Sequence, residues 1–363
     1  MIVPGLAVAL SGTGLLLVWS ATRTQPDQSL LVRQAVAVGI GLALMWLVSR
    51  LDLRVLRAYV PLGYAIAVGS LVGVLTPLGV RVNGQHSWIV LAPGVQFQPA
   101  EFAKLALVLA LAMPLGELRE GERRPGFGAV LTALALAAIP MALIVLQPDP
   151  GTLIVFCAIL AGVILVSGAR LRWLAVLAFG AAATVVAAWQ AGLVRPHHVE
   201  RLMVLADPAS YASGIGYNAA QARIAIGSGG LAGKGLFNGE QTAGHFVPEQ
   251  HTDFIFTVAG EELGFAGGAA IVVLLGVLLW RGVGIAARSG SPYGRVVAGG
   301  VVCWLAAQSF VNVGMTLGLL PIIGVPLPLV SYGGSSTVAC LVAVGLLEAV
   351  RRGRASAWAR DLR

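Results

Sequence analysis

Apolar runs long enough to cross a lipid bilayer follow one another along almost the whole chain. A helix needs about 20 residues to span the hydrocarbon core, where no water can satisfy the backbone, so such a run folds as a helix. Only 11% of the 363 residues are charged and 57% are hydrophobic, against roughly 25% charged in a soluble domain. The pattern predicts an all-α polytopic membrane protein of about ten transmembrane helices, near residues 3–21, 31–50, 58–76, 100–116, 127–147, 151–168, 172–193, 254–281, 295–319 and 327–350.

The basic residues predict the orientation of these helices. Most of the 24 Lys and Arg residues fall in alternate connections, at residues 50–57, 119–124, 170–172, 281–295 and 351–363. Because cytoplasmic connections are enriched in Lys and Arg, both termini are expected in the cytoplasm. The same bias accounts for the net charge of +8. We therefore expect contacts with membrane lipids and no nucleic-acid partner.

The longest connection, residues 194–253, is expected as one large extracytoplasmic loop within a single integral membrane domain that spans residues 1–363. Its segment 216–226 has helical, amphipathic periodicity, which predicts short helices at the membrane surface. The glycine-rich segment 227–235 carries Lys234 and can present backbone N–H groups to a phosphate. Since it lacks the P-loop pattern, a flexible turn is the simpler interpretation.

A carboxylate stands where this loop enters the next apolar run, in Pro248-Glu249-Gln250-His251-Thr252-Asp253-Phe254. Asp253 can simply cap the N-terminus of the helix that follows. Alternatively, it is a catalytic carboxylate at the boundary between water and lipid, with a pKa tuned by burial, by Glu249 and His251, or by a bound cation. The histidines lack metal-binding spacing, which disfavours zinc, whereas an oxygen-liganded divalent ion at Asp253 remains an option.

Two further segments carry polar residues into apolar surroundings. Glu101 and Lys104 lie three residues apart at the start of the fourth predicted helix, where they can form a structural ion pair or line a site. Prolines at 321, 326 and 328 precede a segment that contains Ser331 and Ser335. Because prolines break a helix, and a broken helix at membrane depth lies beside protein or a wet cavity, these serines line that cavity or belong to a helix-entry loop.

Apart from Glu348 at the cytoplasmic end of the last helix, the polar residues within the predicted helices lie in the outer half or near the middle by this topology. They are Arg33, Glu101, Lys104, Gln147, Gln190, Asp253, Glu261, Gln308 and Asn312. A transporter needs a polar route through both leaflets. A polar cavity open to one side only favours chemistry at the outer face.

Five motifs, in this order, resemble those of the shape, elongation, division and sporulation family of bacterial peptidoglycan glycosyltransferases, the RodA/FtsW proteins. They are residues 97–104, 224–235, 248–256, 261–264 and 328–336, and the resemblance covers essentially the whole chain. Two departures are visible: Ala100 stands where the family usually has serine, and residues 83–88 follow the family's loop only loosely. The short tails favour the RodA branch over FtsW.

This resemblance implies a polymerase that joins the disaccharide units of lipid II into glycan strands at the outer face of the cytoplasmic membrane. It releases undecaprenyl pyrophosphate and acts during cell elongation and shape maintenance. Asp253 stands at the position of the family's essential acid. The resemblance also implies a divalent cation, Mg²⁺ or Mn²⁺, no organic cofactor, and a class B penicillin-binding protein as transpeptidase partner.

Such a reaction makes its own demands on the side chains. A sugar hydroxyl is a weak nucleophile that needs a base, and a leaving pyrophosphate needs cations. Arg201, Arg223 and Lys234 are the expected outer cations, and Lys104, positioned by Glu101, is the expected cation of the cavity. Lipid II flipping and a non-catalytic scaffold for the cell-wall machinery are the competing hypotheses. Flipping predicts polar groups in the cytoplasmic half of the helices, and a scaffold predicts dispensable acids.

Overall fold

The computed structural model describes residues 2–24, 29–82, 85–92, 95–117, 124–190, 201, 203–205 and 214–361. Within these residues, eight helices are long and apolar enough to cross a membrane: α1 (Ile2–Thr22), α2 (Ser29–Arg50), α3 (Leu53–Val74), α4 (Pro99–Gly116), α5 (Phe127–Leu146), α12 (Gly264–Ala287), α13 (Pro292–Thr316) and α14 (Gly334–Asp361). Two further helices, α6 (Pro150–Val166) and α7 (Arg172–Gln190), lie at the sixth and seventh predicted spans, with shorter apolar stretches at Pro150–Val166 and Arg172–Thr184. The predicted polytopic helical membrane fold is confirmed.

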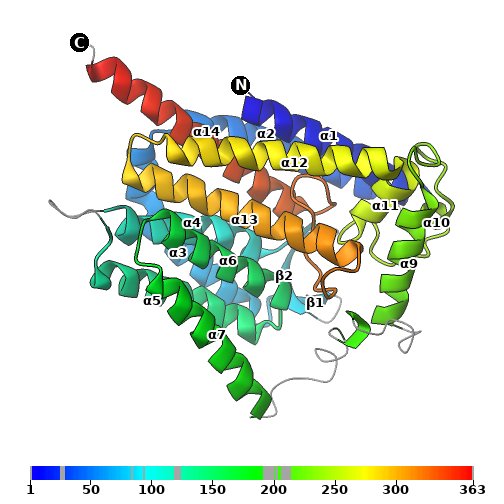
Figure 1. The fold of residues 1–363 in the computed structure, drawn as a ribbon, viewed down its shortest axis with the longest axis horizontal. Helices are drawn as coiled ribbons and strands as arrows, with labels where there is room; N and C mark the ends of the chain where they lie inside the picture. The colour runs from blue at the N-terminus through cyan, green and yellow to red at the C-terminus, as the bar shows by residue number, and fades with distance from the viewer. Residues whose placement is uncertain are drawn as a thin grey trace.

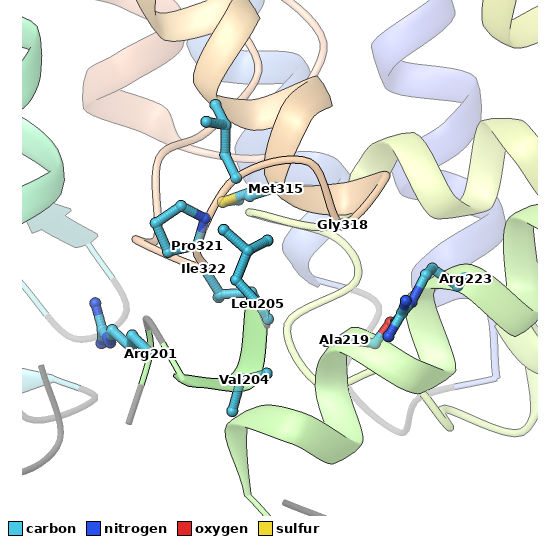
Figure 2. A pocket seen from close by; sticks show the side chains of 10 residues that line it. Arg201, Val204, Leu205, Ala219, Arg223, Met315, Gly318, Pro321 and Ile322 are labelled. Carbon is cyan, nitrogen blue, oxygen red and sulfur yellow. The ribbon is translucent and has the colours of Figure 1, made fainter. Parts of the chain in front are cut away.

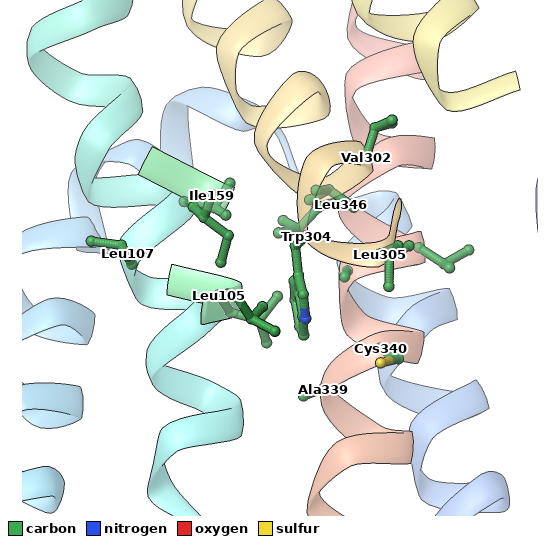
Figure 3. Close-up of a cluster of buried hydrophobic side chains, with 14 of the residues drawn as sticks. Leu105, Leu107, Ile159, Val302, Trp304, Leu305, Ala339, Cys340 and Leu346 are labelled. Atoms are coloured by element: carbon green, nitrogen blue, oxygen red, sulfur yellow. The ribbon is translucent and has the colours of Figure 1, made fainter. Parts of the chain in front are cut away.

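The helices form a bundle with its core around three of them (Figure 1). The share of the 18-residue apolar stretch that is buried inside the protein is 72% in α4, 72% in α13 and 78% in α14. The same share is only 17% in α3 and 28% in α12. Trp304 of α13 points into the space between α4 and α14, near Leu105 and Cys340 (Figure 3). The outer helices expose large apolar side chains, such as Phe179 and Trp280. An apolar core with an apolar exterior is what a bundle surrounded by lipid requires.

Glycine lets the inner backbones approach closely. A Cβ on Gly14 of α1 would lie 2.4 Å from the carbonyl oxygen of Val330, and one on Gly345 of α14 would lie 2.8 Å from that of Met45 on α2. Both positions therefore need glycine, as is common where membrane helices pack. The contact at Gly14 also holds the non-helical segment before α14 against α1.

Two predicted spans are interrupted in the structure. The span predicted at 254–281 is two helices, α11 (Ile255–Glu262) and α12, because Gly264 has a φ of +67° and turns the chain. The span predicted at 327–350 becomes helical only at Gly334, after a proline-rich segment in which Leu329 has a φ of 66°. Both predicted boundaries are wrong, whereas the predicted helix break at the prolines is confirmed.

A three-stranded antiparallel sheet, which the sequence pattern did not predict, lies in the chain between α3 and α4. Its strands are β1 (Gly79–Val82), β2 (Gln85–Ala92) and β3 (Val95–Phe97), in the order β1-β2-β3. Such short alternations do not stand out beside long apolar runs. The N–H of Gln98 donates to Ser335 Oγ over 3.0 Å and ties the end of the sheet to the start of α14.

The long connection predicted at 194–253 is described from residue 214 onward, together with Arg201 and residues 203–205. It contains α9 (Ile215–Ser228), at the predicted amphipathic segment, and the short α10 (Glu240–Ala243). α9 packs against α11 and α13, at the end of the bundle opposite to the C-terminus (Figure 1). The predicted helix is confirmed, and the remainder of the predicted loop, at 194–200, 202 and 206–213, lies outside the described residues.

Candidate active site

Asp253 lies in the turn that leads into α11, against the non-helical segment that precedes α14. Its main-chain carbonyl accepts a hydrogen bond of 2.7 Å from Asn312 Nδ2 of α13, which also donates to the carbonyl of Val325 over 2.7 Å. A Cβ on Gly324, which has a φ of +75°, would lie 3.2 Å from Asp253 Oδ2. The N-cap residue of α11 is Phe254, and no side chain caps this helix. The capping interpretation of Asp253 is therefore wrong, and its carboxylate faces the segment around Gly324.

The surroundings of Asp253 disfavour its charge. Burial raises the pKa of Asp253 to about 7, and the nearby charges of Glu249 and Asp149 contribute in the same direction. The charge of Arg201 opposes them and lowers the pKa. A carboxylate with this pKa is about half protonated at neutral pH, so it can accept a proton and release it again. Such a pKa suits a general base, and the catalytic role of Asp253 stays a prediction.

Asp149 is a second acid of this site that the sequence analysis did not single out. It is the N-cap residue of α6, and its carboxylate accepts hydrogen bonds from Thr152 N over 2.9 Å and Thr152 Oγ1 over 2.8 Å. Burial raises the pKa of Asp149, while Thr152 and the charge of Lys104 oppose that shift. The only signal in the sequence is an acid between two prolines amid apolar runs.

Glu101 and Lys104 form a buried ion pair at the start of α4, with 2.7 Å between Glu101 Oε1 and Lys104 Nζ. Lys104 Nζ also donates to Gln308 Oε1 over 3.1 Å, and Gln308 Nε2 donates to the carbonyl of Pro326 over 2.9 Å. Asn312 follows Gln308 by one helical turn on α13 and faces the same segment. The pair has structural contacts, and through Gln308 it also holds the segment next to Asp253.

Arg201 and Arg223 line a pocket between α9 and the turn after α13 (Figure 2). The other residues that line the pocket are Val204, Leu205, Ala219, Met315, Gly318, Leu320, Pro321 and Ile322. Arg201 Nε and Nη1 are buried, and neither has a hydrogen-bond partner among the described residues. Burial lowers the pKa of Arg201, and the charges of Asp149 and Asp253 oppose this. The structure thus brings two of the three predicted outer cations to one pocket.

Lys234, the third predicted outer cation, pairs with acids of its own region. Its Nζ lies 3.1 Å from Glu261 Oε1. Glu261 is fully buried and also accepts hydrogen bonds of 2.8 Å from Thr242 N and Thr242 Oγ1. These contacts hold the segment 227–235 against α11, which supports its interpretation as a turn. The structure shows Lys234 with this acid and not with Asp253.

The two predicted serines and His251 contact the backbone around the site. Ser331 Oγ accepts a hydrogen bond of 2.8 Å from the main-chain N–H four residues earlier, and Ser335 Oγ accepts the bond that ties the sheet to α14. The carbonyl of His251 accepts a bond of 2.9 Å from Tyr332 N, and the two rings lie 5.4 Å apart. Burial lowers the pKa of His251 and thus favours the neutral form of its ring. These three residues shape the backbone rather than supply charge.

The described residues contain no group of three or more His, Cys, Asp or Glu side chains that could hold a metal ion. Asp253 therefore does not belong to an all-protein metal cage in this part of the chain. Mg²⁺ is commonly held by one or two carboxylates together with the phosphates of a substrate. Asp253 and Glu249 offer carboxylates that repel each other, and so they fit an ion that binds together with a phosphate-bearing substrate.

A family model described as "Cell cycle protein", which combines FtsW, RodA and SpoVE, matches residues 2–356. The chain belongs to the FtsW/RodA/SpoVE family. The peptidoglycan glycosyltransferase MrdB of Escherichia coli K12 is 38% identical to it over 339 residues, which cover 93% of this chain and 90% of MrdB. The resemblance inferred from the motifs is confirmed.

Solved structures of FtsW/RodA/SpoVE relatives share the fold. One is a chain of a peptidoglycan synthase complex described for its coordination of polymerization and crosslinking, with a TM-score of 0.81, 34% identity and 97% of each chain covered. Another is the rod shape determining protein RodA of Thermus thermophilus, with a TM-score of 0.71, 31% identity, and 97% of this chain and 96% of that one covered. The similarity to MrdB and RodA agrees with the predicted RodA branch.

Proposed function

We propose that this chain is a peptidoglycan glycosyltransferase of the RodA branch. It polymerises lipid II into glycan strands at the outer face of the cytoplasmic membrane, releases undecaprenyl pyrophosphate, and acts during cell elongation and shape maintenance. The name of the relative MrdB supports the reaction, and the name of the rod shape determining protein RodA supports the role in cell shape. The basic connections support an orientation with both termini in the cytoplasm. With that orientation, Asp253 faces the periplasm or the cell exterior.

One observation carries this proposal: burial raises the pKa of the Asp253 carboxyl to about 7, and it lies within electrostatic reach of Arg201, whose buried Nε and Nη1 have no hydrogen-bond partner among the described residues. Asp253 takes the proton of the attacking sugar hydroxyl as the hydroxyl oxygen bonds to the anomeric carbon of the second substrate. The bond from that carbon to the pyrophosphate oxygen breaks, and nearby cations stabilise the charge that develops. A single displacement inverts the α-linked donor to a β-linked product and needs no covalent enzyme intermediate.

A divalent cation, Mg²⁺ or Mn²⁺, is part of the proposal, and no organic cofactor is required. Asp253 and Glu249 would hold it together with the substrate phosphates, where it supplies positive charge to the leaving pyrophosphate. The proposed partner is a class B penicillin-binding protein, a transpeptidase that cross-links the new strands. Support comes from the similar chain found in a synthase complex that coordinates polymerization and crosslinking.

The test is polymerisation by the purified protein with its transpeptidase partner, labelled lipid II and a Mg²⁺ or Mn²⁺ salt. We expect glycan strands from the wild type, none from Asp253→Asn, and none after chelation of the ion. Asp52→Asn is the matched control, because Asp52 is the N-cap residue of α3 and lies outside the site. Equal product from the wild type and Asp253→Asn would rule out the role of Asp253 as base. Movement of lipid II across vesicle membranes without any strands would instead support flipping.

A further inference from the structure

The buried nitrogens of Arg201 indicate a missing partner. Nε and Nη1 are both shielded from solvent, and no described residue accepts a hydrogen bond from either. A guanidinium without hydrogen bonds in such surroundings is costly, so a site of this kind is normally completed by an anion. The charges of Asp149 and Asp253 raise the pKa of Arg201, but neither carboxylate accepts a hydrogen bond from Nε or Nη1. As far as the described residues go, Nε and Nη1 of this guanidinium are thus left for an oxygen of another molecule.

The pocket itself indicates a molecule with an anionic part and an apolar part. In Figure 2, Arg201 and Arg223 stand on opposite sides of the pocket, with Leu205, Pro321 and Ile322 between them. Arg223 packs closely against the turn after α13, where a Cβ on Gly318 would lie 3.3 Å from Arg223 Cδ. Two planar donor groups suit phosphate oxygens, and the apolar wall suits a hydrocarbon chain.

The chemistry of the reaction decides which substrate this is. In one substrate, the donor, the pyrophosphate is attached to the carbon that is attacked. In the acceptor, a whole disaccharide separates the attacking hydroxyl from the pyrophosphate. Pro321 and Ile322 line the pocket, and Gly324 of the same segment lies against the carboxylate of Asp253, the proposed base. A cation of this pocket is therefore near the donor's pyrophosphate and not near the acceptor's.

We propose that the pocket between α9 and the turn after α13 binds the pyrophosphate and the first isoprene units of the donor, with Arg201 and Arg223 as its phosphate ligands. This inference rests on the proposed glycosyltransferase function. As the acceptor oxygen bonds to the donor's anomeric carbon, its proton passes to Asp253. The carbon–oxygen bond to pyrophosphate breaks, and the electron pair leaves with the lipid pyrophosphate. That group gains one negative charge, which the two arginines stabilise in the pocket.

Kinetics with separated substrates test this assignment. Lipid II whose sugar hydroxyl is capped serves only as donor, and a lipid-free disaccharide serves only as acceptor. Arg201→Gln and Arg223→Gln should each raise the KM for the capped donor at least about tenfold, the size of one lost charge-assisted contact, and leave the KM for the acceptor unchanged. Arg81→Gln, an exposed arginine on β1, is the matched control and should change neither. A rise in the acceptor KM, or equal changes in both, would overturn the proposal.

Binding of the product tests the same pocket without catalysis. Undecaprenyl pyrophosphate should bind the wild type and Arg81→Gln equally, and bind Arg201→Gln at least about tenfold more weakly. The neutral prenol should bind all three alike, because it lacks the group that the arginines recognise. Arg201→Lys keeps the positive charge but loses the planar pair of N–H donors, so its affinity for undecaprenyl pyrophosphate should lie between those of the wild type and Arg201→Gln. Such an intermediate affinity would show that the weaker binding of Arg201→Gln is not caused by misfolding. Equal binding by the wild type and Arg201→Gln would refute the pocket, whereas selective binding without polymerisation would refute only the proposed function.

Discussion

The side-chain amide of Asn312 joins the main chain at Asp253 to the broken segment before α14. Asn312 Nδ2 donates to the carbonyls of Asp253 and Val325, each over 2.7 Å, and the residue is fully buried. Both hydrogens of the amide are used, so one side chain sets the distance between α11 and the segment that carries Gly324. The position of the Asp253 carboxylate therefore depends on α13.

Replacing Asn312 with alanine should lower both stability and turnover. Two buried carbonyls lose their donor, which costs about 2–4 kcal/mol in unfolding free energy. The turnover number should fall at least about tenfold because the base is no longer held in place. Ser309→Ala on the same helix is the matched control, since the Ser309 hydroxyl has no partner among the described residues. Thermal unfolding in detergent and polymerisation of lipid II measure the two effects, and full activity in Asn312→Ala would contradict the positioning role.

The pKa of Asp253 predicts how activity depends on pH. Because its pKa is raised to about 7, the fraction of ionised base increases through neutral pH. The kcat/KM for lipid II should therefore rise between pH 6 and about pH 8 and then level off. Glu249→Gln removes a neighbouring negative charge, so it should move the profile to lower pH. A profile that is flat between pH 6 and 8, or one that Glu249→Gln leaves unmoved, would show that Asp253 is not the titrating base.

The same shift has the opposite consequence for stability. The native state keeps the Asp253 proton up to about pH 7, whereas an unfolded aspartate loses it near 3.8. Between these values the native state binds more protons, so this residue makes the protein less stable as pH rises. Asp253→Asn should thus unfold at a higher temperature than the wild type at pH 8, with a smaller difference at pH 5. An equal difference at both values would show that the native pKa of Asp253 is not raised.

The contributions of the buried Glu101–Lys104 ion pair to stability and to activity can be measured separately. Lys104→Met leaves the Glu101 carboxylate buried without its ion partner, which costs about 3–5 kcal/mol. The double variant Glu101→Leu/Lys104→Met removes both charges and should regain most of that stability. Its activity should stay low, because Lys104 no longer holds Gln308 or acts on Asp149. Recovery of activity together with stability would mean that the pair only supports the fold.

The membrane fold was readable from the sequence because lipid imposes a simple rule on each apolar run. The breaks were harder to predict. Residues 254–281 are mostly apolar and contain no proline, so they read as one helix. The chain turns where Gly264 approaches the backbone near Gly233. That contact joins segments remote in sequence, as does the one between Gly14 and Val330. The sequence pattern did not predict the sheet at 79–97, because its strands are short and only some of their residues are apolar.

The candidate site was predicted in part. Acids and cations within apolar surroundings pointed to Asp253, Glu101 and Lys104 because unpaired charge is costly there. Asp149 was missed, since an acid before a proline also reads as an ordinary N-cap, and it is one. Which cations pair with protein acids could not be read from the chain. Lys234 and Arg201 are both cations of the same long connection, and the sequence offers no reason to treat them differently. Whether each cation is available to a ligand depends on the acids that the fold places beside it.

Lys234 provides the clearest contrast to Arg201. Its ammonium group pairs with Glu261 over 3.1 Å and Glu240 over 3.3 Å, and these acids raise the pKa of Lys234. Lys234→Gln should lower the unfolding temperature slightly, because the Thr242 bonds to Glu261 remain. The KM for the capped donor should stay at the wild-type value, since Lys234 is already engaged with protein carboxylates. Measuring that KM beside Arg201→Gln makes the comparison direct: an equal rise in both variants would mean that Lys234 leaves Glu261 and binds the donor's pyrophosphate.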